Sequence, residues 1–132
     1  MSTLNEVSLS IEFLNAYSHL PDITVITPVF DPNNSKDIIF FTASRAHHAD
    51  IGGILPGSMP PTSTTIFQEG AEILSFKVVS GGEFDGEGLK RHMVDIPAQY
   101  EGSSGCRKLS DVESDLKAVR LAIFQDPVFH ND

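Results

Sequence analysis

Periodic and alternating runs of apolar residues divide the first part of the chain into three expected elements. Residues 4–17 carry apolar side chains at positions 4, 7, 11 and 14 without Pro or Gly, and this spacing predicts a short amphipathic helix. Residues 23–30 are rich in β-branched side chains and predict a strand. Turn-forming residues at 31–35 precede a second predicted strand at 37–44, which we expect to be buried on both faces. The two strands are expected to form a hairpin.

The middle of the chain predicts one further strand between irregular segments. The strand covers residues 73–79, where β-branched and aromatic side chains gather. Gly and Pro make 52–65 a loop, and the glycines within 81–88 predict turns. Residues 97–107 are mostly polar and are expected to be irregular.

The last element is the clearest helix of the sequence. Ser110 and Glu113 form the pattern of a capping box, in which each side chain satisfies the other residue's exposed N–H. An apolar stripe at helical spacing follows, formed by Val112, Leu116, Val119 and Ile123. Asp126-Pro127 is expected to end the helix. Because strands and helices mix without regular βαβ alternation, we expect an α+β fold with mixed strands and a C-terminal amphipathic helix.

Composition and charge exclude several classes of protein. The 132 residues, 40% of them hydrophobic, suit a single domain, and no apolar run approaches the length of a membrane span. The N-terminus lacks the pattern of a secretory signal, so we expect a cytoplasmic protein. The net charge of −9, without a Lys/Arg cluster, argues against nucleic acid as a partner. A single cysteine, Cys106, excludes an internal disulfide and fits a reducing compartment.

Two sets of histidine and aspartate carry candidate chemistry. His19 and Asp22 lie three residues apart, and Pro21 favours a turn in which their side chains converge. His47 and His48 are adjacent, so in an extended backbone they point to opposite sides, and His48 shares a side with Asp50. Each set by itself also fits a polar turn or ordinary solvated histidines. Together, at the ends of two neighbouring strands, they predict a three-ligand metal site with open positions.

The loops that surround these residues do not identify a nucleotide site. No Walker pattern or Gly-x-Gly-x-x-Gly fingerprint is present, although the glycines at 52–57 could equally approach an anion or form a structural loop. Cys106 stands next to Arg107, a neighbour expected to lower the pKa of the thiol, so Cys106 is a minor candidate for reactivity.

Three strings resemble the hydantoinase B/oxoprolinase family. They are His-Leu-Pro-Asp-Ile-Thr-Val at 19–25, Ser-Arg-Ala-His-His-Ala-Asp-Ile-Gly-Gly at 44–53 and Pro-Gly-Ser-Met-Pro-Pro at 56–61. Shorter matches follow in the same order at Gln68–Ala71, Leu74–Lys77, Ser104-Gly105 with Arg107, and Ser114–Ala118. The chain is most similar to the eukaryotic type of 5-oxoprolinase, and the resemblance extends from about Ser18 to about Ile123.

The resemblance implies the ATP-dependent hydrolysis of a cyclic amide, 5-oxo-L-proline, to L-glutamate, in glutathione metabolism. It implies that residues 1–132 are one partial domain, a fragment of a larger hydantoinase B-type domain that binds a metal. ATP would then be bound by a missing portion or by a hydantoinase A-type ATPase partner.

The same resemblance assigns residues to the site. His19, Asp22 and His48 become the metal ligands, for manganese, iron or zinc, while His47 and Asp50 become alternate ligands or groups that hydrogen-bond to the ligands. Arg45 and Arg107 are candidate contacts for a substrate carboxylate, on the ground of their charge alone.

The sequence also departs from the family pattern. The Asn-x-Pro-Tyr-x-Gly-Gly-type stretch that precedes His-Leu-Pro-Asp is reduced to Tyr17-Ser18, and residues 127–132 do not continue the pattern. We expect the isolated chain to be inactive, and to self-associate because strands cut from a larger sheet leave unpaired edges. The alternative functions are a non-catalytic truncated remnant and a small metal-binding module.

Overall fold

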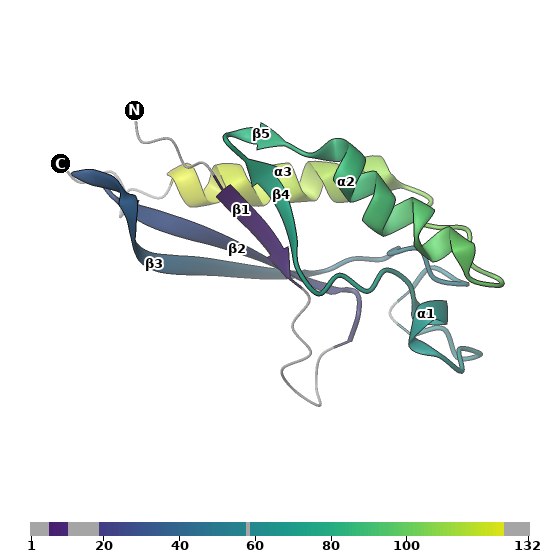
Figure 1. Cartoon of the computed structure of the whole chain (residues 1–132). Helices are drawn as coiled ribbons and strands as arrows, with labels where there is room; N and C mark the ends of the chain where they lie inside the picture. The colour runs from purple at the N-terminus through teal and green to yellow at the C-terminus, as the bar shows by residue number, and fades with distance from the viewer. Residues whose placement is uncertain (1–5, 11–18, 58, 126–132) are drawn as a thin grey trace.

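The computed structural model describes residues 6–10, 19–57 and 59–125, and the side chains of 19–34, 36–57 and 59–118. Strands and helices are both present, which confirms the α+β class (Figure 1). The strands are β1 (Glu6–Ser10), β2 (Asp22–Asp31), β3 (Asn34–His47), β4 (Phe76–Ser80) and β5 (Glu83–Phe84). The α-helices are α1 (Ile66–Glu69), α2 (Gly86–Lys90) and α3 (Leu109–Gln125), and single turns of π-helix and 3₁₀-helix follow α2 at Arg91–Asp95 and Pro97–Gln99.

The five strands form one antiparallel sheet in the order β3-β2-β1-β4-β5. The central strand, β1, lies inside the segment 4–17, so the helix predicted there is wrong for Glu6–Ser10. Val7 and Leu9 alternate with polar residues, and this period of two fits a strand. The spacing of positions 4, 7, 11 and 14 fits a helix equally well. Hydrogen-bonded neighbours on both sides, β2 and β4, decide between the two periods. The rest of the predicted helix lies outside the described residues.

The predicted hairpin is confirmed, and both of its strands are longer than expected. The connection is tight, because the side chain of Asp31 accepts a hydrogen bond from the N–H of Asn33 (2.7 Å). Near this turn the pairing shifts twice, from Asp31–Asn34 to Phe30–Ile38 and then to Val29–Phe40. From there the ladder runs regularly to its open end, where Asp22 lies opposite His47.

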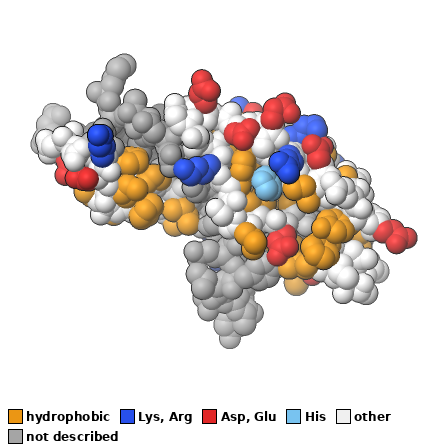
Figure 2. All heavy atoms as spheres, in the orientation of Figure 1, with side chains coloured by type: hydrophobic (Ala, Val, Ile, Leu, Met, Phe, Trp, Pro, Cys, Tyr) orange, Lys and Arg blue, Asp and Glu red, His pale blue; other side chains and the backbone are white. Residues whose placement is uncertain are grey.

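Strand β3 is the edge of the sheet, and the expectation that it is buried on both faces is wrong. Its four consecutive large apolar residues, Ile38–Phe41, are each between 42% and 61% exposed. Among the described residues, only β2 pairs with β3, so the outer edge of β3 has no strand beside it. Figure 2 shows hydrophobic side chains gathered on the surface over this hairpin.

Helix α3 confirms the predicted C-terminal helix and packs into the core through Val112 and Leu116. The side chains of Val119 and Ile123 lie outside the described part. The expected capping box does not form, because the helix begins at Leu109 and includes Ser110. The Ser110 hydroxyl donates to Asp111, and the carboxylate of Glu113 accepts from Lys117.

The region of residues 73–99 differs most from expectation. The third strand begins only at Phe76, and β5 follows after the glycine turn. The turn predicted at Asp85–Gly88 is instead the start of α2. Asp85 is the N-cap of this helix, and its carboxylate accepts a hydrogen bond from the N–H of Gly88 (2.8 Å). Two glycines make this helix intrinsically weak, and burial of Leu89 and of Met93 in the next turn stabilises it instead. Across the described ranges, every helix is too short or too polar to cross a lipid bilayer.

Candidate metal centre

A tight turn brings His19 and Asp22 together. The N–H of Asp22 donates to the carbonyl of His19 (2.9 Å), and buried Pro21 occupies the turn. The imidazole Nδ1 of His19 therefore lies 3.7 Å from Oδ2 of the Asp22 carboxylate. This confirms the expectation that the proline turn makes two residues three positions apart converge.

His47 is the third member of the group. It is the last residue of β3 and lies directly opposite Asp22, the first residue of β2. Its Nδ1 lies 3.0 Å from Oδ1 of Asp22, and its ring centroid is 5.0 Å from that of His19. One ligand-type atom from each of the three residues lies within 4.8 Å of the others. The side chains are partly exposed, so the group has room for additional ligands from solvent or substrate.

The carboxylate of Asp22 is stabilised in its charged form. Burial by itself raises the pKa of Asp22, but the hydrogen bond to His47 and the nearby imidazole of His19 outweigh this effect, so the pKa lies below its ordinary value. Asp22 thus supplies a negative charge shared between two imidazoles, and this donor set of nitrogen and oxygen suits a divalent transition metal.

His48 lies on the other side of the strand end and does not join this group. Its side chain is 6% exposed, and its Nδ1 lies 3.8 Å from Oδ2 of Asp115 on α3. Its backbone N–H donates to the carbonyl of Pro21 (2.9 Å). Burial lowers the pKa of His48, although Asp115 opposes the shift. The geometry therefore favours His47 over His48 as the partner of His19 and Asp22, and metal binding by either remains a prediction.

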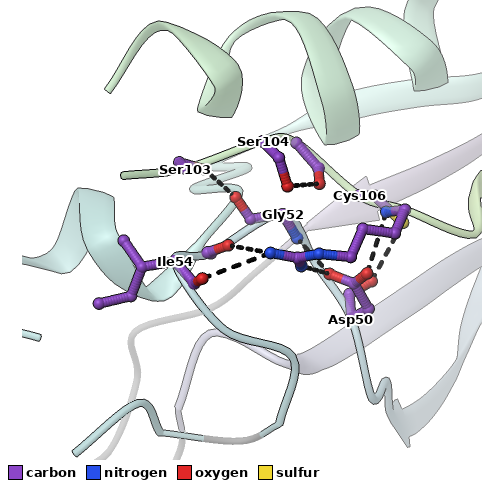
Figure 3. Close-up of polar contacts among 9 residues, drawn as sticks. Asp50, Gly52, Ile54, Ser103, Ser104 and Cys106 are labelled. Carbon is purple, nitrogen blue, oxygen red and sulfur yellow. Dashed lines mark hydrogen bonds and ion pairs between the residues drawn. The ribbon is translucent and has the colours of Figure 1, made fainter. Parts of the chain in front are cut away.

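Asp50 lies outside the group as well, in a network that joins two distant loops. Its carboxylate accepts hydrogen bonds from the N–H of Gly52 (3.0 Å), the N–H of Arg107 (2.9 Å) and the guanidinium of Arg107 (3.2 Å). The guanidinium also donates to the carbonyls of Gly53 and Ile54. Figure 3 shows the hydrogen bonds at Asp50 and at the carbonyl of Ile54, with Ser103 donating to the carbonyl of Gly52 beside them.

We call this network of Asp50 and Arg107 the loop clasp. In it the Arg107 guanidinium donates to the Asp50 carboxylate and to two backbone carbonyls of the loop at 50–54. The structure therefore gives no support to the expected contact between Arg107 and a substrate carboxylate. The same region buries Cys106, whose thiol donates to the carbonyl of Asp50 (3.2 Å). Burial raises the pKa of this thiol, so the expectation of a lowered pKa is wrong, although Arg107 opposes the shift.

Arg45 lies on the same strand as His47. It precedes His47 by two positions on β3, so the two residues share a face of the sheet, and its Nε donates to the hydroxyl of Thr24 (2.9 Å). Arg45 as a whole is exposed. Its role as a substrate contact stays a prediction.

Comparison with known proteins extends these observations. The family model described as Hydantoinase B/oxoprolinase matches residues 12–123. The chain is 56% identical over 104 residues, 79% of its length, to "Uncharacterized protein C11D3.14c" of Schizosaccharomyces pombe. It is 54% identical over 101 residues, 76% of its length, to "5-oxoprolinase" of Saccharomyces cerevisiae. A weaker similarity, 31% over 100 residues, joins it to "Acetophenone carboxylase delta subunit" of Aromatoleum aromaticum.

The matched part is small relative to these proteins. The chain spans 8% of the length of the S. pombe and S. cerevisiae relatives and 13% of the carboxylase subunit. The residues that the family model matches, 12–123, include His19, Asp22 and His47.

Proposed function

Since the chain belongs to the hydantoinase B/oxoprolinase family, we propose that it is part of an enzyme that hydrolyses 5-oxo-L-proline to L-glutamate with ATP, within glutathione metabolism. The observation that carries the proposal is the convergence of His19, Asp22 and His47 in a chain that is 54% identical to a yeast 5-oxoprolinase. Residues 1–132 would then form a single partial hydantoinase B-type domain in the cytoplasm, where the unpaired Cys106 stays reduced.

We propose His19, Asp22 and His47 as the residues that hold a divalent metal, manganese, iron or zinc. Two imidazoles and a carboxylate are suitable donors, and their spacing allows all three to reach one ion. A bound ion would supply Lewis-acid polarisation of the amide carbonyl. The Asp22 carboxylate lies 3.0 Å from Nδ1 of His47 and 3.7 Å from Nδ1 of His19, and the Pro21 turn fixes the position of His19 relative to Asp22.

ATP would be bound by another part of the enzyme. The sequence contains no recognisable nucleotide fingerprint, so the proposal assigns ATP to a hydantoinase A-type portion or partner. The 132-residue chain assayed by itself should then release no glutamate from 5-oxo-L-proline and ATP. Glutamate release by the purified chain would refute this division of labour.

A second candidate is a non-catalytic remnant or a small metal-binding module. The exposed edge of β3 favours it, because Ile38–Phe41 would be covered in a complete sheet. This candidate and the enzyme fragment differ in whether activity appears when a hydantoinase A-type protein is added together with ATP.

The metal content of the purified chain tests the proposal. We expect about one metal ion per folded chain, lost in His19→Ala and in His47→Ala, as for a three-ligand site. His92→Ala is the matched control. His92 lies against the Phe76 ring and is not part of the candidate metal group, so this variant should keep the metal. Loss in His48→Ala together with retention in His47→Ala would restore the ligand set expected from sequence. A folded wild-type chain without metal after exposure to manganese, iron and zinc would overturn the metal site.

A further inference from the structure

A cavity of about 430 Å³ opens beside the candidate metal ligands. Its wall is formed by the 19–22 turn, the loop before α1 and α1 itself, through His19, Leu20, Met59, Ser63, Thr64, Thr65, Ile66 and Glu69. His19 belongs to both the cavity and the candidate metal group, whereas Asp22 and His47 are not in the wall. The volume lies within the roughly 300–1,000 Å³ typical of small-molecule sites.

The wall combines apolar surface with two unengaged polar groups. Ile66 and Met59 supply the accessible apolar part, and buried Leu20 lies beneath it. Ser63 donates its hydroxyl to the carbonyl of Pro60, and Thr64 donates to the side chain of Gln68, so both are already engaged. Within the described ranges, the Thr65 hydroxyl and the Glu69 carboxylate have no hydrogen-bond partner and remain available to a ligand.

Glu69 is held in position although α1 has only four residues. A helix this short does not persist by itself, so its position must come from tertiary contacts. The N–H of Ile54 donates to the carbonyl of Gln68 (2.9 Å), and the N–H of Ala71 donates to the carbonyl of Ile51 (2.8 Å). These two bonds attach the C-terminal end of α1, which carries Glu69, to the loop that follows β3.

Gly53 permits this close approach. A Cβ atom at position 53 would lie 2.5 Å from the carbonyl oxygen of Glu69, so any larger residue would push α1 away. The loop clasp of Asp50 and Arg107 fixes the same loop from its other side. Glu69 therefore faces the cavity from a fixed backbone.

We propose that this cavity binds the cyclic amide group of a small ligand, with Glu69 and Thr65 as its recognition residues. The Glu69 carboxylate accepts the amide N–H, the Thr65 hydroxyl donates to the amide carbonyl, and Met59 and Ile66 pack against the ring carbons. A hydrogen bond to a carboxylate is stronger than one between neutral groups, so Glu69 contributes most to recognition. The proposal rests on the proposed function for the ligand class, but it assigns residues and an N–H requirement of its own.

The charge of the wall leads to a further expectation. Among the wall residues that the structure describes, Glu69 is the one carboxylate, and none of them is a Lys or Arg. A neutral lactam should therefore bind without metal, whereas 5-oxo-L-proline, which carries a carboxylate of its own, should bind only when a cation occupies the neighbouring ligand group. This difference separates the cavity from the metal site in an experiment.

The test is ligand-observed NMR with 2-pyrrolidinone, an uncharged lactam, on the metal-free chain. We expect saturable binding that weakens at least tenfold in Glu69→Leu and less in Glu69→Gln, which keeps an acceptor. Glu72→Leu is the matched control, because Glu72 is exposed and lies outside the cavity wall, and it should bind as the wild type does. N-methyl-2-pyrrolidinone, which lacks the N–H, should not bind to the wild type.

The metal site and the lactam cavity can be refuted independently of each other. Loss of binding in Glu69→Leu with unchanged metal content supports the cavity. A folded wild-type chain that ignores 2-pyrrolidinone, or equal binding by Glu69→Leu and the wild type, overturns the cavity and leaves the metal site standing. Binding of the lactam to a chain that never takes up metal overturns the metal site and leaves the cavity standing.

Discussion

Removal of the Asp50 carboxylate should destabilise the whole chain, because the loop clasp joins segments more than fifty residues apart in sequence. Asp50→Ala removes three hydrogen bonds, two of them from backbone N–H groups that would lose their acceptor. Bonds to a charged group contribute roughly 1.5–3 kcal/mol each, and these three share one carboxylate, so we expect a total loss of about 3 kcal/mol. At roughly 3–5 °C per kcal/mol for a chain of this size, Tm should fall by about 9–15 °C.

The assay is urea unfolding followed by circular dichroism, with Asp95→Ala as the matched control. Asp95 also pairs with a cation, Lys90 at 2.8 Å, but both side chains are 48% exposed. An exposed pair of this kind contributes about 0–1 kcal/mol, so the control should stay close to the wild type. The contrast separates loss of the clasp from loss of any surface aspartate.

A double-mutant cycle with Arg107→Ala locates the energy within the clasp. The guanidinium supplies only one of the three bonds to Asp50, and the Arg107 side chain is 37% exposed, so the coupling between the two side chains should be about 1 kcal/mol or less. Most of the cost of Asp50→Ala should remain in the Arg107→Ala background. If Asp50→Ala lowers the free energy of unfolding no more than Asp95→Ala does, the stabilising role of the loop clasp is refuted. If Asp50→Ala also removes bound metal while stability is unchanged, Asp50 is a metal ligand instead.

Three further predictions concern charge, burial and the sheet edge. Burial, with Arg91 adding to its effect, lowers the pKa of His92 below the ordinary 6.5, so His92 binds a proton more readily in the unfolded chain than in the folded one. Stability should therefore rise as pH increases towards that value, and an identical rise in His92→Gln would contradict this origin. Burial raises the pKa of Cys106, so the native thiol at pH 8 should react with Ellman's reagent at least about tenfold more slowly than in urea; equal rates would contradict its burial. Phe41→Lys, at the exposed edge strand, should reduce self-association in sedimentation velocity more than Leu74→Lys, at a site outside the sheet that is even more exposed (71% against 61%); a wild-type monomer at all concentrations would refute self-association.

Local sequence was sufficient for the elements whose signal is strong and short in range. The turn formers at 31–35 between two β-branched runs predicted the hairpin, and Val112 and Leu116 predicted the buried face of α3. Pro21 correctly predicted the turn that brings His19 and Asp22 together. Each of these features depends on residues within a few positions of one another.

The segment Glu6–Ser10 shows where local pattern was insufficient. Its apolar residues fit both a helical and an alternating period, and the helix predicted there gives way to the central strand. The partners that decide, β2 and β4, are separated from β1 by ten or more residues. Likewise, nothing in the apolar run Ile38–Phe41 distinguishes a buried strand from an exposed edge, because that depends on which strands pair beside it.

The sequence by itself determined the donor residues of the candidate site, and the tertiary structure decided which of them meet. A regular ladder counted from the Asp31–Asn34 pair would place Ala43 opposite Asp22, but the two shifts near the turn bring His47 there instead. Because neighbouring residues of a strand point to opposite sides, the same register turns His48 away into the core beside α3. Bulges alter register through backbone pairing rather than side-chain type, so the choice between two adjacent histidines is made only when the strands come together.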